Sequence, residues 1–186
     1  MSTQLGFFAR CGGSMGVQRC VSRLLLAFGC AFSCLYASAS DGLAACASNP
    51  VMHKLDYWLG EWSVDSGRGR SDVHLSLDSC EIVEAWSSKT TDHRGENTIA
   101  YNSEEKTWYA LFVDNRGRAH MFSGTVDDGS AQFEGPSRDE NGKAVLKRVR
   151  VVRENPQTVD QIWEKSNDKG ATWEPDFKME YVRKTP

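Results

Sequence analysis

The chain has 186 residues, a formal net charge of −3, and 40% hydrophobic and 10% aromatic residues. This length and balance predict one globular domain rather than a disordered chain. The only charged residues before Ser40 are Arg10, Arg19 and Arg23, so the part that follows is more acidic than the whole chain. An acidic domain lacks the basic surface that attracts nucleic acids and anionic membranes, so neither is expected as a partner. No apolar run reaches the ~18 residues that a transmembrane helix needs.

The N-terminal residues have the three parts of a secretory signal peptide. Positive charge comes first, an uncharged apolar run follows at 24–36, and a small-x-small cleavage site, Ala-Ser-Ala, stands at 37–39. The pattern predicts a signal peptide over residues 1–39, an N-terminal segment over 40–54 and a folded domain over 55–184. The mature protein is therefore expected to be periplasmic or secreted.

The cysteines bear on the same question. Four of the six lie in the leader, and Cys46 and Cys80 remain. An even pair in an oxidising compartment predicts one disulfide. The Leu-Ala-Ala-Cys that ends at Cys46 also resembles a lipobox, whose cysteine would carry a lipid anchor, although Asp41 interrupts the apolar run before it. This lipoprotein alternative stays open, as does translation from Met15 rather than Met1.

From Glu61 onward, short segments rich in β-branched and aromatic residues alternate with turn clusters. The turn clusters lie at 65–72, 77–79, 90–97, 102–107, 114–118, 127–130, 136–143, 154–158 and 166–172. Nine turns spaced about ten residues apart are typical of an all-β sandwich or barrel. The sequence predicts a single antiparallel meander barrel of eight to ten strands, preceded by a short helix over 52–59.

Residues 108–113 are apolar on both faces of their predicted strand. Side chains alternate between the two faces of a strand. The segment is therefore expected to border the barrel lumen on one side and a packed cover on the other.

Five motifs in order carry a family resemblance. The first is Leu-Asp-Tyr-Trp-Leu-Gly-Glu-Trp; together they lie at 55–62, 80–86, 108 with 113–117, 161–166, and 173 with 181–183. The chain resembles a family of bacterial exported lipocalin-like (calycin) domains of unknown function, which open with an FDFWLG-x-W-like run. The resemblance covers most of residues 55–184. It implies a calycin-type antiparallel barrel and export, and no established reaction.

The tripeptide Gly60-Glu61-Trp62 is similar to the G-x-W signature of calycins. The resemblance implies that Trp62 closes one barrel end and that Arg183, on the last strand, lies over its indole. A guanidinium above an indole face is a favourable cation–π contact. The late Thr-Asp-Tyr motif of true lipocalins is absent, which favours a looser calycin relative.

Several common kinds of site are excluded by spacing. The four histidines form no pair with metal-ligand spacing, so no metal site is expected, and His93 lies in a turn where it should be solvated. There is no G-x-S-x-G elbow and no phosphate-binding loop. No cofactor is therefore expected.

The candidate ligand-binding residues are polar side chains among apolar strand neighbours, together with the aromatic residues beside them. They are Glu84, Trp86, Trp108, Phe112, His120, Gln161 and Trp163. Burying the tryptophans would carry Glu84 and Gln161 into the lumen, because residues two apart share a face. A buried Glu84 would need a partner, and Arg148 or Arg150 is expected to supply it.

The leading functional hypothesis is an exported barrel that binds a small, largely apolar molecule without catalysis. One alternative is an enzyme that uses Glu84 and His120 as lumenal acid and base. A second is a haem- or nitric-oxide-binding barrel of the nitrobindin type, with a histidine as axial ligand. A third is a structural envelope protein with a filled barrel. The sequence has no feature that specifies an oligomeric state.

Overall fold

The computed structural model describes residues 46–184, and the predicted leader and both candidate start codons lie outside them. Three 3₁₀ helices and ten strands make up this part of the chain. The helices are η1 (Pro50–His53), η2 (Asp56–Trp58) and η3 (Leu77–Ser79). The strands are β1 (Gly60–Val64), β2 (Gly69–Ser76), β3 (Glu81–Ser88), β4 (Arg94–Asn102), β5 (Thr107–Asp114), β6 (Ala119–Asp127), β7 (Ser130–Arg138), β8 (Ala144–Asn155), β9 (Thr158–Ser166) and β10 (Glu174–Arg183).

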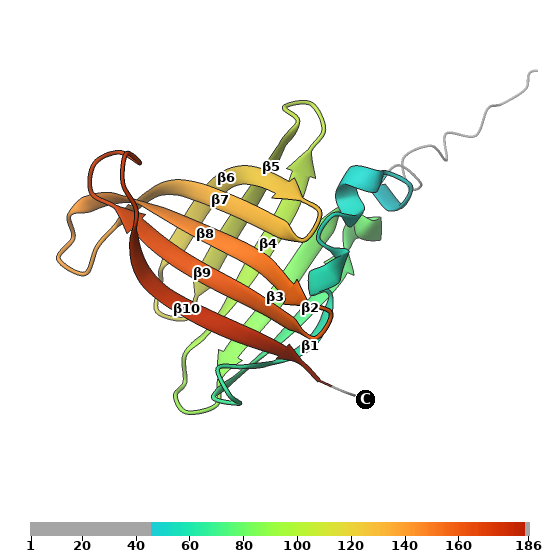
Figure 1. Cartoon of the computed structure of the whole chain (residues 1–186), viewed down its shortest axis with the longest axis horizontal. Helices are drawn as coiled ribbons and strands as arrows, with labels where there is room; N and C mark the ends of the chain where they lie inside the picture. Colours follow the sequence, from blue (N-terminus) through green and yellow to red (C-terminus); the bar gives the residue numbers. More distant parts are fainter. Residues whose placement is uncertain (1–45, 185–186) are drawn as a thin grey trace, which may run out of the picture. The chain divides into compact units, whose positions relative to one another are not determined.

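The ten strands form a closed antiparallel barrel, in which each strand pairs with its neighbours in the sequence (Figure 1). The first and last strands close the sheet, with Trp62 opposite Arg183 and Val64 opposite Tyr181. Closure leaves no unpaired strand edge. This closed meander confirms the predicted all-β barrel. The prediction was possible because the turn clusters are visible in the sequence.

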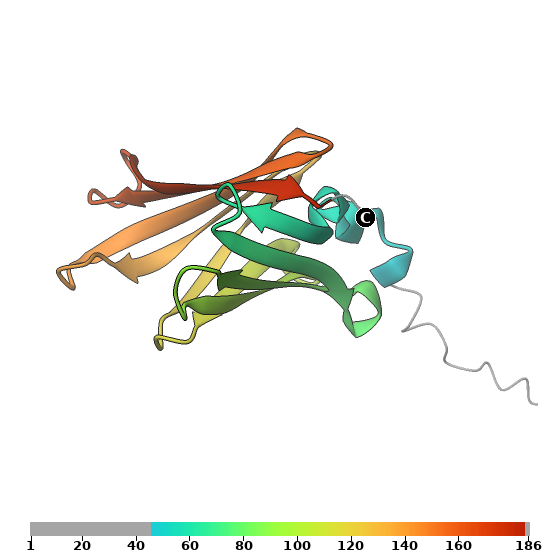
Figure 2. The same cartoon turned by 90° about the horizontal axis from the view of Figure 1, so that it is seen from below.

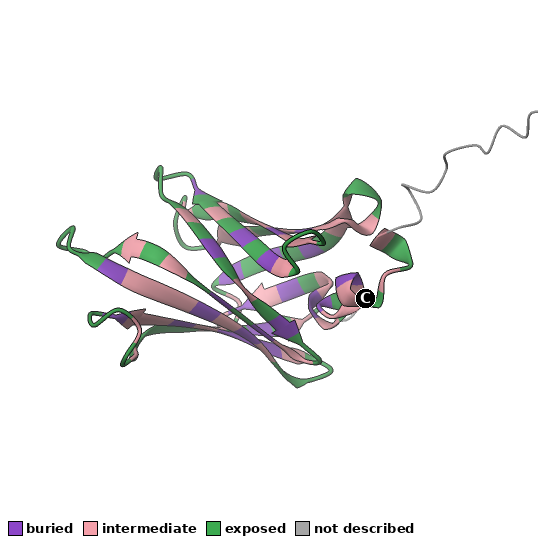
Figure 3. Ribbon diagram, turned by 90° about the horizontal axis from the view of Figure 1, so that it is seen from above, coloured by how far each residue is buried: buried purple, intermediate pink, exposed green. Residues whose placement is uncertain are grey.

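Buried and exposed residues alternate along most strands, as Figure 3 shows. In β2, Gly69, Ser71 and Val73 are buried, whereas the residues between them are exposed. At one end of the barrel, the side chains that point inward are large and apolar. Burial of these side chains supplies most of the stabilisation, at roughly 25 cal/mol per Å² of apolar surface.

The helical segment closes one end of the barrel (Figures 1 and 2). The expected short helix is present as two 3₁₀ turns, η1 and η2, and Leu55 between them is completely buried. Lys54 donates to the carbonyl of Val126 on β6 (3.2 Å), and the Tyr57 hydroxyl donates to that of Val151 on β8 (2.9 Å). These two hydrogen bonds attach the helical segment to two different strands, β6 and β8.

Trp62 and Arg183 lie at this closed end in the arrangement that the G-x-W resemblance implies. The Trp62 indole is completely buried, and the Arg183 guanidinium carbon lies 4.2 Å from its ring centroid. Arg183 also donates to the carbonyl of Leu59 (2.6 Å). Gly60 has φ = +121°, and a Cβ there would lie 2.7 Å from Arg183 Nη1. Glycine is needed at position 60 for both reasons.

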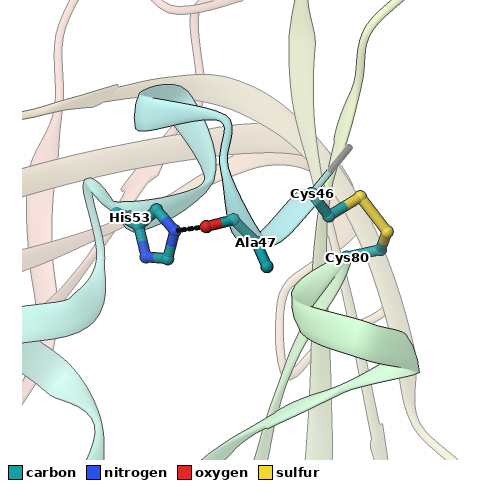
Figure 4. Close-up of a disulfide and its surroundings, with 4 residues drawn as sticks. All are labelled: Cys46, Ala47, His53 and Cys80. Carbon is teal, nitrogen blue, oxygen red and sulfur yellow. Dashed lines mark hydrogen bonds between the residues drawn. A yellow bond between two sulfur atoms is a disulfide. The ribbon is translucent and has the colours of Figure 1, made fainter. Parts of the chain in front are cut away.

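A disulfide joins Cys46, ahead of η1, to Cys80, between η3 and β3 (Figure 4). The predicted pairing is thus present, with the two Cα atoms 5.0 Å apart. Beside it, the His53 ring bonds through Nε2 to the carbonyl oxygen of Ala47 at 2.8 Å. A sulfur in a disulfide cannot also carry a lipid thioether, so the disulfide and the lipoprotein alternative are mutually exclusive.

Loss of this disulfide is expected to lower the free energy of unfolding by about 3–4 kcal/mol, because it closes a loop between residues that are 34 positions apart. Urea unfolding of the Cys46→Ser/Cys80→Ser variant, compared with the oxidised parent protein, measures this loss.

Intact-mass measurement of protein from its own host tests the disulfide and the predicted cleavage site together. The expected mass is that of a chain that starts near Ser40, less the two hydrogen atoms lost when the disulfide forms. A diacyl mass on Cys46 would contradict the disulfide.

The outer face of β5 differs from the prediction of a packed cover. Tyr109, Leu111 and Val113 are 37%, 42% and 44% exposed, and the neighbouring Met121 of β6 is 68% exposed. No element within residues 46–184 covers them. The apolar pattern correctly indicated the lumen on one side, but alternation alone cannot show what covers the other.

Candidate functional site

A cavity of about 120 Å³ lies in the lumen, toward the end of the barrel opposite the helical segment. At this end the chain turns between β1 and β2, β3 and β4, β5 and β6, β7 and β8, and β9 and β10. Six of the seven predicted ligand-binding residues line the cavity: Glu84, Trp86, Phe112, His120, Gln161 and Trp163. Alternation along the strands predicted that these side chains share inward faces, and the six residues do line one common cavity.

Trp108 is the exception. It is 4% exposed and packs against Tyr101, with the ring centroids 5.4 Å apart, in the filled part of the core. It shares a strand face with Phe112 but lies four residues earlier on β5, which is about 13 Å along a strand. Trp108 belongs to the core and does not line the cavity.

Glu84 lies at the deep side of the cavity and is 4% exposed. Its Oε1 accepts hydrogen bonds from the hydroxyls of Ser71 (2.8 Å) and Tyr181 (2.9 Å). The side-chain amides of Asn97 and Gln161 also donate to its carboxyl group. Burial raises the pKa of Glu84 above its ordinary value, and these hydrogen bonds offset only part of the effect.

The expected pairing of Glu84 with Arg148 or Arg150 is wrong. Both arginines donate through Nε to Glu164, at 2.8 Å and 3.1 Å. They alternate with the buried Val149 and Val151, so they face outward from β8. The partners of Glu84 are therefore neutral donors, and no lysine or arginine among residues 46–184 pairs with its carboxyl group.

The remaining polar groups on the deep side present one free acceptor. Gln161 Oε1 accepts from Trp163 Nε1 at 2.8 Å, which fixes the orientation of its amide. Asn97 Oδ1 is buried and has no hydrogen-bond partner among residues 46–184. Trp86 Nε1 is also buried and unpartnered, but it lies against Gly69, where a Cβ would be 3.3 Å away. We refer to Glu84, Asn97, Gln161 and Tyr181 as the polar floor.

Aromatic rings form the walls above the polar floor. His120 lies nearly parallel to Phe112, with centroids 6.2 Å apart, and Trp163 is stacked on Phe177 at 5.4 Å. Desolvation, together with the positive charge of Lys147, lowers the pKa of His120, so its imidazole is neutral at pH 7. Its Nδ1 lies 3.3 Å from Ser137 Oγ.

Three basic side chains line the mouth of the cavity: His93, Arg118 and Lys147. Arg118 Nε donates to Asp114 at 2.7 Å, and His93 Nε2 lies 3.0 Å from the same carboxylate. Burial would raise the pKa of Asp114, but these and two backbone hydrogen bonds hold it well below its usual range. Lys147 pairs with Asp176 at 3.0 Å.

His93 was expected to be solvated in a turn, and this expectation is wrong. Its side chain is 21% exposed and packs against Trp86, with ring centroids 5.1 Å apart. The turn between β3 and β4 brings it to Asp114 on β5, a contact that is not visible in the local sequence.

Sequence reasoning missed part of the lining: Asn97, Lys147, Phe177, Met179 and Tyr181. Asn97 alternates with Ile99, and Lys147 with Val149, so the signal that identified Glu84 was available for both. The neighbouring Arg148 and Arg150 obscured Lys147, because the stretch reads as a basic run. Phe177 lies next to an irregularity in the β9–β10 register, which breaks the simple alternation.

A larger depression of about 590 Å³ lies on the outside of the barrel. Its lining consists mainly of charged residues that face outward, such as Arg70, Asp72, Arg94 and Glu96. Trp86 is the one aromatic residue in its lining, and the depression is open to solvent. The lumenal cavity, which has aromatic walls and buried polar groups, is the better candidate for a specific site.

The chain matches no protein-family model and no curated protein. Among residues 46–184, no helix is long and apolar enough to cross a membrane. The same residues contain no group of three or more His, Cys, Asp or Glu side chains placed to hold a metal ion.

Proposed function

We propose that the barrel binds one small, largely apolar molecule in its lumen. The cavity above the polar floor supports this most directly, because it combines aromatic walls with a few fixed hydrogen-bonding groups. Its volume of about 120 Å³ is smaller than the roughly 300–1,000 Å³ of drug-sized sites. A dry cavity of roughly 150 Å³ can hold benzene, so this cavity encloses at most one ring, and a substituent on that ring has to reach the mouth.

We also propose that the protein is an exported member of the lipocalin-like family that it resembles. The Cys46–Cys80 disulfide fits an oxidising compartment. The closed barrel and the contact of Arg183 with Trp62 fit the calycin pattern. Protein purified from its own host and weighed by native mass spectrometry should show a ligand as added mass.

A lumenal enzyme is the second candidate. Glu84 and His120 line the same cavity, and their environments push their pKa values in opposite directions, up for the carboxyl group and down for the imidazole. Two titratable groups in one site whose environments push their pKa values apart are the arrangement expected of an acid and base pair. The haem alternative does not fit, because a macrocycle exceeds this cavity. A completely filled barrel does not fit either.

Placing a larger ring in the lumen tests the binding proposal. Phe112→Trp should weaken the binding of p-cresol, measured by NMR titration, about tenfold or more, because the added ring occupies the cavity. Leu111→Trp is the matched control: it adds a ring to the outward, 42% exposed neighbour and should leave the affinity unchanged. Equal effects of the two variants, or no binding by the parent protein, would contradict a lumenal site.

A further inference from the structure

The two ends of the lumenal cavity have opposite hydrogen-bonding character. On the polar floor, Asn97 and Gln161 each direct an amide N–H to Glu84, and Gln161 Oε1 accepts from Trp163. The floor atom that is buried without any partner is an acceptor, Asn97 Oδ1. A buried polar group without a partner costs free energy, so a ligand that brings a donor here recovers it. The floor therefore selects an N–H or O–H group.

The mouth of the cavity presents donors. Lys147 Nζ has three N–H groups and one partner, Asp176. Arg118 uses Nε and Nη2 for Asp114 and His93, and its Nη1 has no hydrogen bond among the described residues. Both side chains line the cavity. Free donors on cationic groups select an acceptor, and a carboxylate is the acceptor that lysine and arginine bind most strongly.

The walls between the two ends are aromatic. His120 lies nearly parallel to Phe112, with 13° between the planes, and Trp163 to Phe177, with 17°. The two pairs meet at an angle, with 69° between the planes of Phe112 and Trp163, and with Trp86 they form an angled aromatic wall, against which a planar ring can pack face to face or edge to face. The volume of the cavity limits the ligand to one ring with small substituents.

We infer that the ligand is a single planar ring with a hydrogen-bond donor, amino or hydroxyl, at one end and a carboxylate at the opposite end. The donor meets Asn97 Oδ1 on the polar floor, and the carboxylate meets Lys147 and Arg118 at the mouth. This inference rests on the proposed lumenal binding and specifies the class of ligand.

Four single-ring probes test the polarity by isothermal titration calorimetry: 4-aminobenzoate, 4-nitrobenzoate, aniline and toluene. 4-Aminobenzoate has both groups, 4-nitrobenzoate replaces the donor with acceptors, and aniline lacks the carboxylate. We expect 4-aminobenzoate to bind about 10- to 100-fold more tightly than either, since each loses one hydrogen-bonded end. Toluene tests the aromatic wall alone and should bind most weakly.

The contribution of the mouth is tested by Lys147→Met, which removes the ammonium group and keeps an apolar stem. It should weaken 4-aminobenzoate about tenfold or more and leave aniline unchanged. Lys178→Met is the matched control, because Lys178 also pairs with an aspartate, Asp160 at 2.6 Å, on the outer face of the barrel. It should alter the affinity of neither probe.

The outcomes separate this inference from the proposed function. If 4-nitrobenzoate, aniline or toluene binds as tightly as 4-aminobenzoate, or if Lys147→Met leaves the preference intact, the bipolar ligand class is wrong and lumenal binding stands. If none of the four probes binds at millimolar concentration, both proposals fail.

Discussion

Trp62→Ala is expected to lower the free energy of unfolding by about 3–5 kcal/mol, the cost of truncating a large buried side chain. The indole is completely buried and meets Tyr181 edge to face, with ring centroids 6.4 Å apart. Its Nε1 donates to the carbonyl of Trp58 at 2.8 Å. The substitution therefore opens a cavity under Arg183, removes its cation–π contact and leaves a buried carbonyl without its donor.

Urea unfolding followed by circular dichroism measures this cost. Trp173→Ala is a useful comparison, because Trp173 also lies under a guanidinium, that of Arg148 at 4.1 Å, but on the partly exposed β9–β10 turn. It should cost clearly less than Trp62→Ala. Equal costs would mean that the G-x-W end does not anchor the barrel.

The strand pattern could be predicted because the information is local. Each turn cluster combines residues that favour reversal, and each strand between them has β-branched or aromatic residues. A meander also places sequence neighbours side by side, so the order of the strands follows from their number. Closure is the one long-range step, and the pairing of Trp62 with Arg183 was accessible only through the resemblance to calycins.

Depth and partners within the lumen could not be predicted in the same way. Alternation assigns a residue to a face but not to a height along the barrel, which is why Trp108 was grouped with Phe112. The error over Arg148 and Arg150 is different. Both alternate with valines, so burying the valines already requires the arginines to face outward. The prediction nevertheless assigned one of them to Glu84, because a buried carboxylate needs a partner. In the structure, Glu84 accepts hydrogen bonds from neutral donors instead.

Those neutral donors make Glu84 the other position at which a large effect is expected. Glu84→Leu should lower the free energy of unfolding by about 3 kcal/mol or more, because it leaves the hydroxyls of Ser71 and Tyr181 and two amides without an acceptor, at about 1–3 kcal/mol for each unsatisfied group. Glu84→Gln should cost less, since its amide oxygen can still accept from both hydroxyls. Denaturant unfolding of the two variants at pH 7 measures the difference.

The pH dependence of Glu84→Gln distinguishes a buried carboxyl group from any other polar residue at this position. Burial raises the pKa of Glu84 in the folded state, so the folded protein binds more protons than the unfolded chain between the ordinary and the raised value. Stability then falls as the pH rises through that window and is level above it. The stability of the parent protein relative to Glu84→Gln should therefore decrease from about pH 4.5 upward, while contributions from the other titrating groups, Asp114 among them, cancel in the difference. If the difference rises with pH instead, a cation stabilises the carboxylate in the lumen, and the assignment of neutral donors to the polar floor is wrong.

Titration of Glu84→Gln with 4-aminobenzoate separates a structural role of Glu84 from a role in binding. Unchanged affinity would give Glu84 a purely structural role. Weakened affinity with little loss of stability would place it in the binding site.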